Sequence, residues 1–286
     1  MSDNKYCLIT GATSGIGKET TKDLLKKGYF LIILSRNLKR GQKLKNELVT
    51  EFSLVNETIY IIQADLSSLN EVRLACDEIK KKYEKINLLI NNAGVFAPRR
   101  RLTKDNLELT MAVNHFGHFL LTLELLPLLE KAGPESRIVN VSSVGHYKAP
   151  AFDIDNINFD KGFSGFNAYR ISKLANLLFT YKLAEKLTEK NSTITVNALH
   201  PGVVRTNIAR KFPIVGWLWR INPQYISAEK GAENTIFLAT DPNLSQTTGK
   251  YFSKLRERKS SEQSYDKELQ NKLWNLSLKI TQTNWN

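Results

Sequence analysis

The sequence contains little cysteine and no long apolar segment. Its 286 residues include two cysteines, Cys7 and Cys76, which give neither a disulfide framework nor a spacing typical of metal ligands. No run of eighteen apolar residues occurs, so no membrane-spanning helix is predicted, and the first residues lack the apolar stretch of a signal peptide. Internal repeats and low-complexity linkers are also missing. These absences favour one domain in a reducing compartment, and we expect a cytoplasmic protein.

Acidic residues are scarce relative to basic ones. The chain has 41 Lys and Arg against 28 Asp and Glu, which gives a formal net charge of +13. Such a charge is compatible with a nucleic-acid or membrane partner. The basic clusters at 80–82, 99–101 and 254–259 are scattered, however, and accompany no recognised nucleic-acid motif. Ordinary solvated faces are therefore favoured, and we expect no nucleic-acid partner.

Short apolar runs alternate regularly with longer amphipathic stretches. The runs predict strands at 6–10, 30–34, 58–62, 87–90, 137–141 and 193–199, and the stretches predict helices at 15–27, 38–52, 69–84, 104–131, 168–189 and 228–239. Such alternation is typical of an α/β fold with a doubly wound parallel sheet covered on both faces. No composition break divides the pattern. We predict a single domain over residues 1–260, followed by a polar helical tail at 261–286 with Trp274 as its anchor.

A glycine-rich turn follows the first predicted strand and opens the first predicted helix. Its sequence is Thr-Gly-Ala-Thr-Ser-Gly-Ile-Gly, from Thr10 to Gly17. Glycine lets the backbone bend tightly and approach a pyrophosphate, which then sits on the helix N-terminus. The spacing is wider than that of the usual dinucleotide fingerprint, and a glycine turn alone could be an ordinary loop. Its position between strand and helix favours a nucleotide site in a Rossmann-type fold.

The end of the second predicted strand carries basic residues instead of acidic ones. A carboxylate at this point holds the ribose 2′-hydroxyl of NAD, whereas an arginine suits the 2′-phosphate of NADP. Arg36, Lys39 and Arg40 lie here, and no Asp or Glu is near. A solvated helix start is the alternative, but a cation is electrostatically unfavourable at a helix N-terminus. We therefore predict NADP(H) as the cofactor, with Arg36 at its 2′-phosphate.

One tyrosine is paired with a lysine at helical spacing. Of the ten tyrosines, only Tyr169 has a lysine four positions later, Lys173. On a helix these two side chains share a face, and a nearby cation lowers the pKa of a phenol toward neutrality. Such a pair could exchange a proton with a carbonyl or alcohol oxygen. Alone, the pair is weak, since any basic protein can contain one by chance.

Taken in order along the chain, these motifs resemble the short-chain dehydrogenase/reductase family over almost the full length. Further matches are Asp65-Leu66, Asn91-Asn92-Ala93-Gly94, Asn114, Val141-Ser142-Ser143, Pro201-Gly202 and Thr206. The resemblance implies that NADP(H) is bound by Gly11, Thr13, Ser14, Gly15, Ile16, Gly17, Arg36, Asp65, Leu66, Asn92, Ala93, Gly94, Tyr169, Lys173, Pro201, Gly202 and Thr206. No metal is predicted, since neither the cysteines nor the histidines have a spacing typical of metal ligands.

The same resemblance implies four catalytic residues. Tyr169 would be the general acid in reduction and the general base in oxidation, and Ser143 would hold the carbonyl oxygen. Lys173 would lower the pKa of the phenol and bind the nicotinamide ribose. Asn114 would fix a water behind Lys173. Two histidines near Asn114, His115 and His118, have no third ligand at a suitable spacing, so packing or hydrogen-bonding roles are favoured over a metal site.

A long insert separates the serine from the tyrosine. Ser143 and Tyr169 are 26 positions apart (169 − 143), whereas shorter family members place them about half as far apart. The lengthened insert resembles the retinol dehydrogenase branch of the family. The resemblance implies an apolar carbonyl or alcohol substrate, such as a retinoid, steroid or lipid. Within the insert, His146 is a minor candidate for substrate contact.

Three further possibilities remain open at this level. The apolar segment 212–219, with two tryptophans, could pack on the domain, cover a bulky substrate or contact a membrane surface. The long helices before the fifth strand and around Tyr169 resemble those that form dimer contacts in the family, so a homodimer is possible. The alternative to an enzyme is a catalytically weak module that senses NADP(H), although Asn114, Ser143, Tyr169 and Lys173 are all present.

Overall fold

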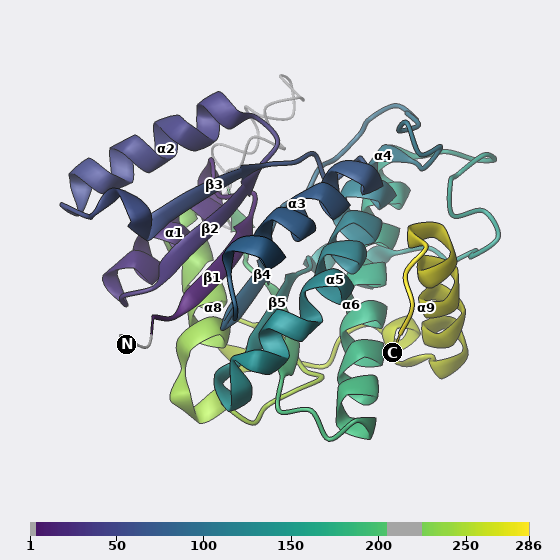
Figure 1. The fold of residues 1–286 in the computed structure, drawn as a ribbon. Helices are drawn as coiled ribbons and strands as arrows, with labels where there is room; N and C mark the ends of the chain where they lie inside the picture. Colours follow the sequence, from purple (N-terminus) through teal and green to yellow (C-terminus); the bar gives the residue numbers. More distant parts are fainter. Residues whose placement is uncertain (1–3, 205–224, 286) are drawn as a thin grey trace.

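A computed structural model describes residues 4–204 and 225–285 (Figure 1). Thr206 and the apolar segment 212–219 therefore lie outside the described residues. The strands are β1 Tyr6–Thr10, β2 Phe30–Ser35, β3 Ile59–Gln63, β4 Leu88–Asn91, β5 Arg137–Val141, β6 Thr195–His200, β7 Val203–Val204, β8 Tyr225–Ile226, β9 Tyr251–Ser253 and β10 Arg256–Glu257. The principal helices are α1 Gly15–Lys26, α2 Leu38–Glu51, α3 Leu69–Lys82, α4 Leu109–Met111, α5 Gly117–Lys131, α6 Gly165–Glu189, α8 Ala228–Thr240 and α9 Lys267–Thr281.

Eight strands form one sheet in the order β10-β9-β6-β5-β4-β1-β2-β3. Every pairing is parallel except that of β9 with β10. The chain runs outward from β1 to β3, then crosses back so that β4 pairs with the other edge of β1. This reversal leaves a crevice at the carboxyl ends of β1 and β4, the usual ligand position in open α/β sheets. The predicted α/β, doubly wound, single-domain fold is confirmed.

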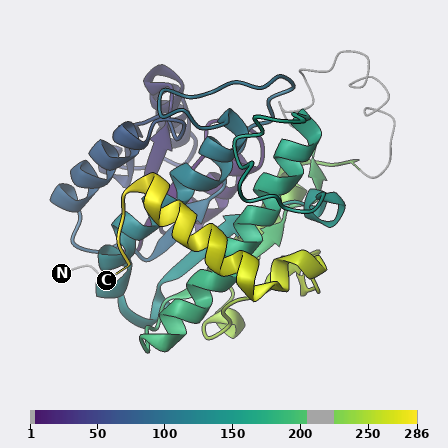
Figure 2. The ribbon, with the colours of Figure 1, turned by 90° about the vertical axis from the view of Figure 1, so that its right-hand side faces the viewer.

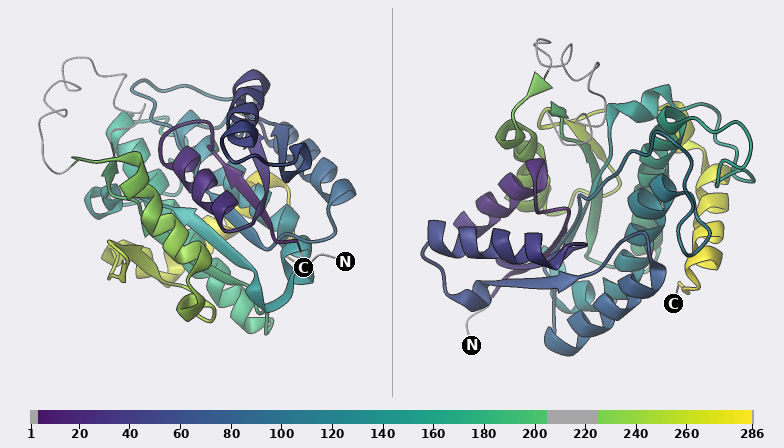
Figure 3. Two further views of the ribbon diagram at one scale, coloured as in Figure 1. Left: turned by 90° about the vertical axis from the view of Figure 1, so that its left-hand side faces the viewer. Right: turned by 90° about the horizontal axis from the view of Figure 1, so that it is seen from above.

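Helices cover both faces of the sheet, as the alternation of side chains along β1 requires. Leu8 packs into the apolar core beneath α3, α5 and α6, whereas Cys7 and Ile9 pack into the core beneath α1, α2 and α8. The right-hand view of Figure 3 shows these two layers on opposite sides of the sheet. Both faces are apolar because both are covered, so the strands read as nearly continuous hydrophobic runs.

The helix predicted at 104–131 differs from the structure at its start. Helical structure begins only at Leu109, where the Glu108 carboxylate caps the backbone N–H of Met111. A π-helical turn, Ala112–Phe116, then separates α4 from α5. By length and composition the stretch Leu109–Lys131 could cross a membrane, but 83% of its most apolar window is buried inside the protein. Its apolar character is therefore that of a core helix.

Two other helix starts depend on local capping. Ser68 accepts a hydrogen bond from the backbone N–H of Glu71, as a capping residue of α3 should. The Glu71 carboxylate accepts a hydrogen bond from the backbone N–H of Asp65, which follows β3. This bond connects the end of β3 to the start of α3. Helix α6 begins at Gly165, three residues earlier than predicted, because Ser164 caps it.

The C-terminal helix α9 lies across α6 and α5 (Figure 2). Trp274 is 3% exposed, and its ring lies 5.2 Å from that of Phe119 and 6.2 Å from that of Phe179. These rings belong to the long helices on which dimer contacts were expected. A homodimer through those helices would therefore have to use faces that α9 leaves free.

Candidate active site

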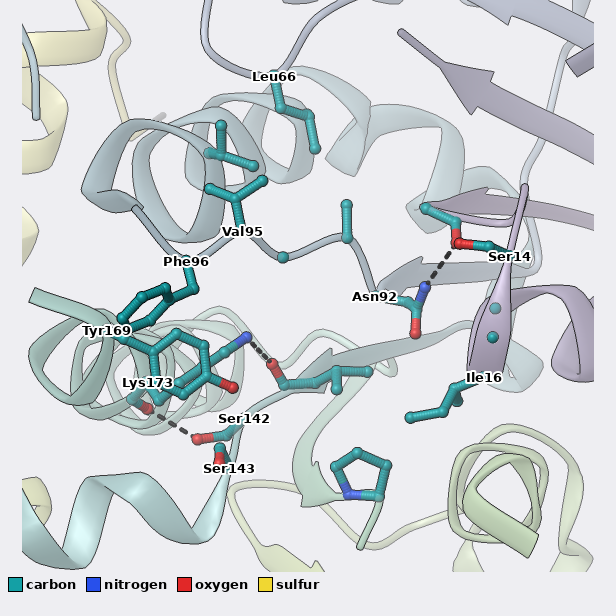
Figure 4. A pocket seen from close by; sticks show the side chains of 18 of the residues that line it. Ser14, Ile16, Leu66, Asn92, Val95, Phe96, Ser142, Ser143, Tyr169 and Lys173 are labelled. Atoms are coloured by element: carbon teal, nitrogen blue, oxygen red, sulfur yellow. Dashed lines mark hydrogen bonds between the residues drawn. The ribbon is translucent and has the colours of Figure 1, made fainter. Parts of the chain in front are cut away.

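The predicted motifs meet in one cavity at the carboxyl ends of the parallel strands. The cavity has a volume of about 890 Å³. Figure 4 shows Asn92 and Ser14 at one end and Tyr169, Lys173 and Ser143 at the other. Its lining includes every predicted cofactor residue that the structure describes: Gly11, Thr13, Ser14, Gly15, Ile16, Gly17, Arg36, Asp65, Leu66, Asn92, Ala93, Gly94, Tyr169, Lys173, Pro201 and Gly202. Ser143 also lines it, but Asn114 does not.

The glycine-rich turn is shaped to receive a phosphate group. Gly11 and Gly15 have φ angles of +69° and +56°, which residues with a Cβ rarely adopt. A Cβ on Gly17 would lie 2.3 Å from the carbonyl oxygen of Gly11, so the backbone can close here only with glycine. Ser14, the N-cap of α1, makes no side-chain capping hydrogen bond among the described residues. The first N–H groups of α1 are thus available for an anion.

Asn92, after β4, holds the turn in place. Its side-chain Nδ2 donates to the carbonyl oxygens of Thr10 and Gly11 at 2.9 and 3.2 Å. The Thr10 hydroxyl in turn accepts from the backbone N–H groups of Asn92 and Ala93 at 3.0 and 2.9 Å. These bonds cross the crevice between β1 and β4, so the two cofactor motifs form one rigid unit.

Arg36 follows β2, which pairs with β1 on the side opposite to β4 and Asn92. It lines the part of the cavity around the glycine-rich turn, called the nucleotide end below. Its side chain is 69% exposed, and its Nε is 3.9 Å from the Asp65 carboxylate after β3. Asp65 itself accepts hydrogen bonds from the backbone and hydroxyl of Ser67 at 2.9 and 2.8 Å. An exposed pair at this distance is weak. The guanidinium therefore keeps donors for an anionic ligand, and Arg40 lines the same part of the cavity.

The catalytic end is formed by the end of β5 and one face of α6. The Ser143 hydroxyl accepts from the backbone N–H of Gly145 at 3.1 Å, and it lies close enough to the Tyr169 phenol to lower the pKa of that phenol. Lys173 is 3% exposed, and its Nζ donates to the carbonyl oxygen of Val141 at 3.0 Å. Ser142 donates to the carbonyl oxygen of Lys173 at 2.8 Å. Strand and helix are thus joined on both sides of the reactive pair.

The pKa shifts at this end follow from burial. Burial lowers the pKa of Lys173 to about 8, because an ammonium loses hydration there. Burial raises the pKa of Tyr169, and the hydrogen bond with Ser143 lowers it only in part. The expected lowering of the phenol pKa by Lys173 is therefore not what this structure shows. The reason is geometric: Lys173 Nζ lies 5.8 Å from the centre of the Tyr169 ring and is held by Val141.

Asn114 occupies the π-helical turn, and its side chain is fully engaged. Its Oδ1 accepts from the backbone N–H of Val95 at 2.8 Å, and its Nδ2 donates to the Val95 carbonyl and to Ser172 Oγ at 3.1 and 2.9 Å. It therefore joins the loop after β4 to α6. A water held behind Lys173 stays a prediction.

Two comparisons with known proteins identify the family, and a third agrees with the fold. The family model described as short chain dehydrogenase matches residues 5–213. Human retinol dehydrogenase 14 is 36% identical over 97% of this chain and 86% of its own. A crystal structure of an uncharacterised protein from Mycobacterium paratuberculosis has a TM-score of 0.80 at 29% identity, over 99% of this chain and 95% of that one. NADPH-bound carbonyl reductase from chicken fatty liver has a TM-score of 0.66 at 22% identity, over 87% and 96%.

The chain belongs to the short-chain dehydrogenase family. The predicted family is confirmed, and so is the resemblance to retinol dehydrogenases, which match it over nearly its full length. The protein is accordingly an oxidoreductase by family.

Several residues of this short-chain dehydrogenase have site roles that the sequence did not reveal. His118 is buried between the Thr10 hydroxyl, at 2.9 Å from its Nε2, and the Asn114 carbonyl, at 3.2 Å from its Nδ1. It thus links the cofactor turn to the π-helical turn. His146 was a candidate for substrate contact, but it is fully buried and bonds the Ser143 carbonyl instead. Conversely, His200 lines the cavity.

Proposed function

We propose that the protein is an NADP(H)-dependent oxidoreductase that interconverts an alcohol and an aldehyde or ketone on an apolar substrate. One observation carries the proposal: a single cavity joins the glycine-rich turn and Arg36 to Ser143, Tyr169 and Lys173. A dinucleotide with its pyrophosphate on α1 and its 2′-phosphate beside Arg36 would extend toward Tyr169. The carbonyl reductase noted above is named as an NADPH complex, which is consistent with this cofactor.

The residues at the catalytic end would move one proton. The bound nicotinamide supplies or accepts the hydride. Ser143 and Tyr169 would both bond the substrate oxygen, since both side chains line this end of the cavity. The Tyr169 phenol, whose pKa burial raises, is protonated at neutral pH, as a general acid for carbonyl reduction must be before it donates its proton. Lys173 would bind the nicotinamide ribose. Its ammonium would also add positive charge near the Tyr169 phenol as the phenol loses its proton.

The walls beside Tyr169 favour an apolar substrate. The Phe96 ring lies 6.2 Å from the Tyr169 ring and 5.1 Å from the Phe166 ring, and all three side chains line the cavity. Figure 4 shows Phe96 next to Tyr169, on the side away from the glycine-rich turn. An apolar chain or ring against these faces would place its carbonyl at the phenol.

The direct test is turnover of NADPH with a panel of retinoid, steroid and alkyl carbonyl compounds. We expect the reduced-nicotinamide absorbance to fall with at least one apolar aldehyde or ketone. The alternative, a module that senses NADP(H), predicts tight NADPH binding with no turnover across the whole panel. That result would overturn the proposed enzymatic function.

We expect Arg36→Asp to reverse the cofactor preference. The change removes the cation at the 2′-phosphate and adds a carboxylate that suits the ribose 2′-hydroxyl of NADH. The ratio of kcat/KM for NADPH to that for NADH should fall by about 10²-fold or more, since a charge-assisted phosphate contact is lost and a repulsion gained. The measurement is steady-state kinetics with both cofactors.

Lys39→Asp is the matched control for this experiment. It makes the same charge change three residues away, outside the residues that line the cavity. The ratio of kcat/KM for NADPH to that for NADH should fall in Arg36→Asp and stay near the wild-type value in Lys39→Asp. An unchanged ratio in Arg36→Asp would contradict the assignment of the 2′-phosphate site.

We expect carbonyl reduction to weaken at alkaline pH as Lys173 loses its proton. The pKa of Lys173 is lowered to about 8, so the ammonium is present below this pH and lost above it. The kcat/KM should fall up to about tenfold per pH unit above pH 8, since it follows groups of the free enzyme. Lys173→Arg should shift this decline to higher pH, because a guanidinium stays charged. A wild-type profile that is flat well above pH 8 would contradict the role of Lys173.

A further inference from the structure

We infer that the substrate carries an anionic group, such as a carboxylate, at the end remote from the reacting carbonyl, and that Arg170 and Lys148 bind it. The inference rests on the proposed function and names its substrate class. Both residues line the cavity at its catalytic end. They come from different elements, α6 and the turn at Val144–Lys148 that follows Ser143.

The described residues at this end include no carboxylate. Of the described residues that line the cavity, the only acidic one is Asp65, which lies at the nucleotide end beside Arg36. Within the part of the chain that the structure describes, neither Lys148 nor Arg170 has a carboxylate within ion-pair distance. The sequence from 205 to 224 contains no Asp or Glu, so it cannot supply one either.

Arg170 is held in place on the aromatic wall. Its Cζ lies 5.9 Å from the centre of the Phe166 ring, and its Nη1 is 3.4 Å from Asn167 Oδ1. Its stem lies near the turn after Ser143, since a Cβ on Gly145 would be 3.8 Å from Arg170 Cγ. Positions 166 and 170 are neighbours on α6, and Phe166, Tyr169 and Arg170 all line the cavity.

This arrangement orders three kinds of contact outward from the phenol. The carbonyl meets Tyr169, an apolar body lies against Phe96 and Phe166, and an anion reaches Arg170 and Lys148. A purely apolar substrate would leave both cations beside its surface, with no acid in this part of the lining to neutralise them. A carboxylate would form charge-assisted hydrogen bonds with these two cations.

The test compares ω-oxo fatty acids with their methyl esters over several chain lengths, using NADPH. For wild type we expect kcat/KM to favour the best acid over its ester by about tenfold or more. The double variant Lys148→Met/Arg170→Met should bring this ratio close to one. Lys161→Met removes a charge from the same insert outside the lining and should keep the wild-type ratio. An acid that is not preferred in wild type, or a preference that survives in the double variant, would overturn the anion site.

A binding measurement separates this inference from the proposed function. Calorimetry with the NADP⁺-saturated protein compares dodecanoate with methyl dodecanoate, which need no turnover. Tighter binding of dodecanoate than of its ester, lost in the double variant, would support the anion site even if no carbonyl were reduced. In that case only the proposed enzymatic function would be wrong. Equal binding of the two ligands would overturn the anion site whatever the turnover.

Discussion

Tyr169→Phe is expected to lower kcat/KM for carbonyl reduction by about 10²–10⁴-fold, the usual contribution of a positioned general acid. The change removes one oxygen and leaves the ring against Phe96, so the cavity keeps its shape. Binding of NADPH, measured by fluorescence titration, should change much less than turnover. The measurement is single-substrate kinetics with the best carbonyl found.

The control for this prediction is Tyr60→Phe, which removes a phenol hydroxyl bonded to Glu78 far from the cavity. It should have nearly wild-type kinetics. If Tyr169→Phe reduced every active substrate as fast as wild type, the proton would have to come from another group. The assignment of the acid would then be wrong, although the cofactor site would be unaffected.

Trp274→Ala is expected to lower the free energy of unfolding by about 3–5 kcal/mol, as other large aromatic truncations in cores do. Trp274 lies within 5.2 Å of the Phe119 ring and is stacked on Phe179, and Lys186 Nζ lies 5.4 Å from its ring centre. Removing the indole opens a cavity between α9 and the two long core helices. Urea denaturation monitored by circular dichroism would measure the loss.

Asn275→Ala is the matched control, since Asn275 is the exposed neighbour of Trp274 on the same helix. Its effect should stay within about 0.5 kcal/mol. If Trp274→Ala cost no more than Asn275→Ala, the tail would be a separate appendage of the domain. A large cost would show instead that residues after 260 belong to its cooperative core.

Most strands and helices could be predicted because each follows from a local pattern. Buried strands such as Phe30–Ser35 are short apolar runs, and the glycine turn between β1 and α1 has a sequence signature. The prediction failed where a contact distant in sequence decides the local structure. The π-helical turn holds Asn114 so that it bonds Val95 and Ser172, and the start of α4 depends on Glu108. The spacing of these residues along the sequence does not indicate any of these contacts.

The site shows the same division. Residue types and order indicated Ser143, Tyr169 and Lys173, and the structure brings them into one cavity. The direction of the Tyr169 pKa shift could not be derived from helical spacing. It depends on how much water reaches the phenol and on where the lysine Nζ points, and the ammonium is bonded to Val141.

The sequence by itself determined the fold class, the cofactor turn and the set of reactive side chains, because periodicity, glycine placement and functional groups are properties of the chain. Only the tertiary structure decided what surrounds them. It put α9 over the long helices, made His146 a support of Ser143, and placed Arg170 and Lys148 in the lining of the cavity. Burial, desolvation and charge balance arise from residues far apart in sequence, so they exist only once the chain has folded.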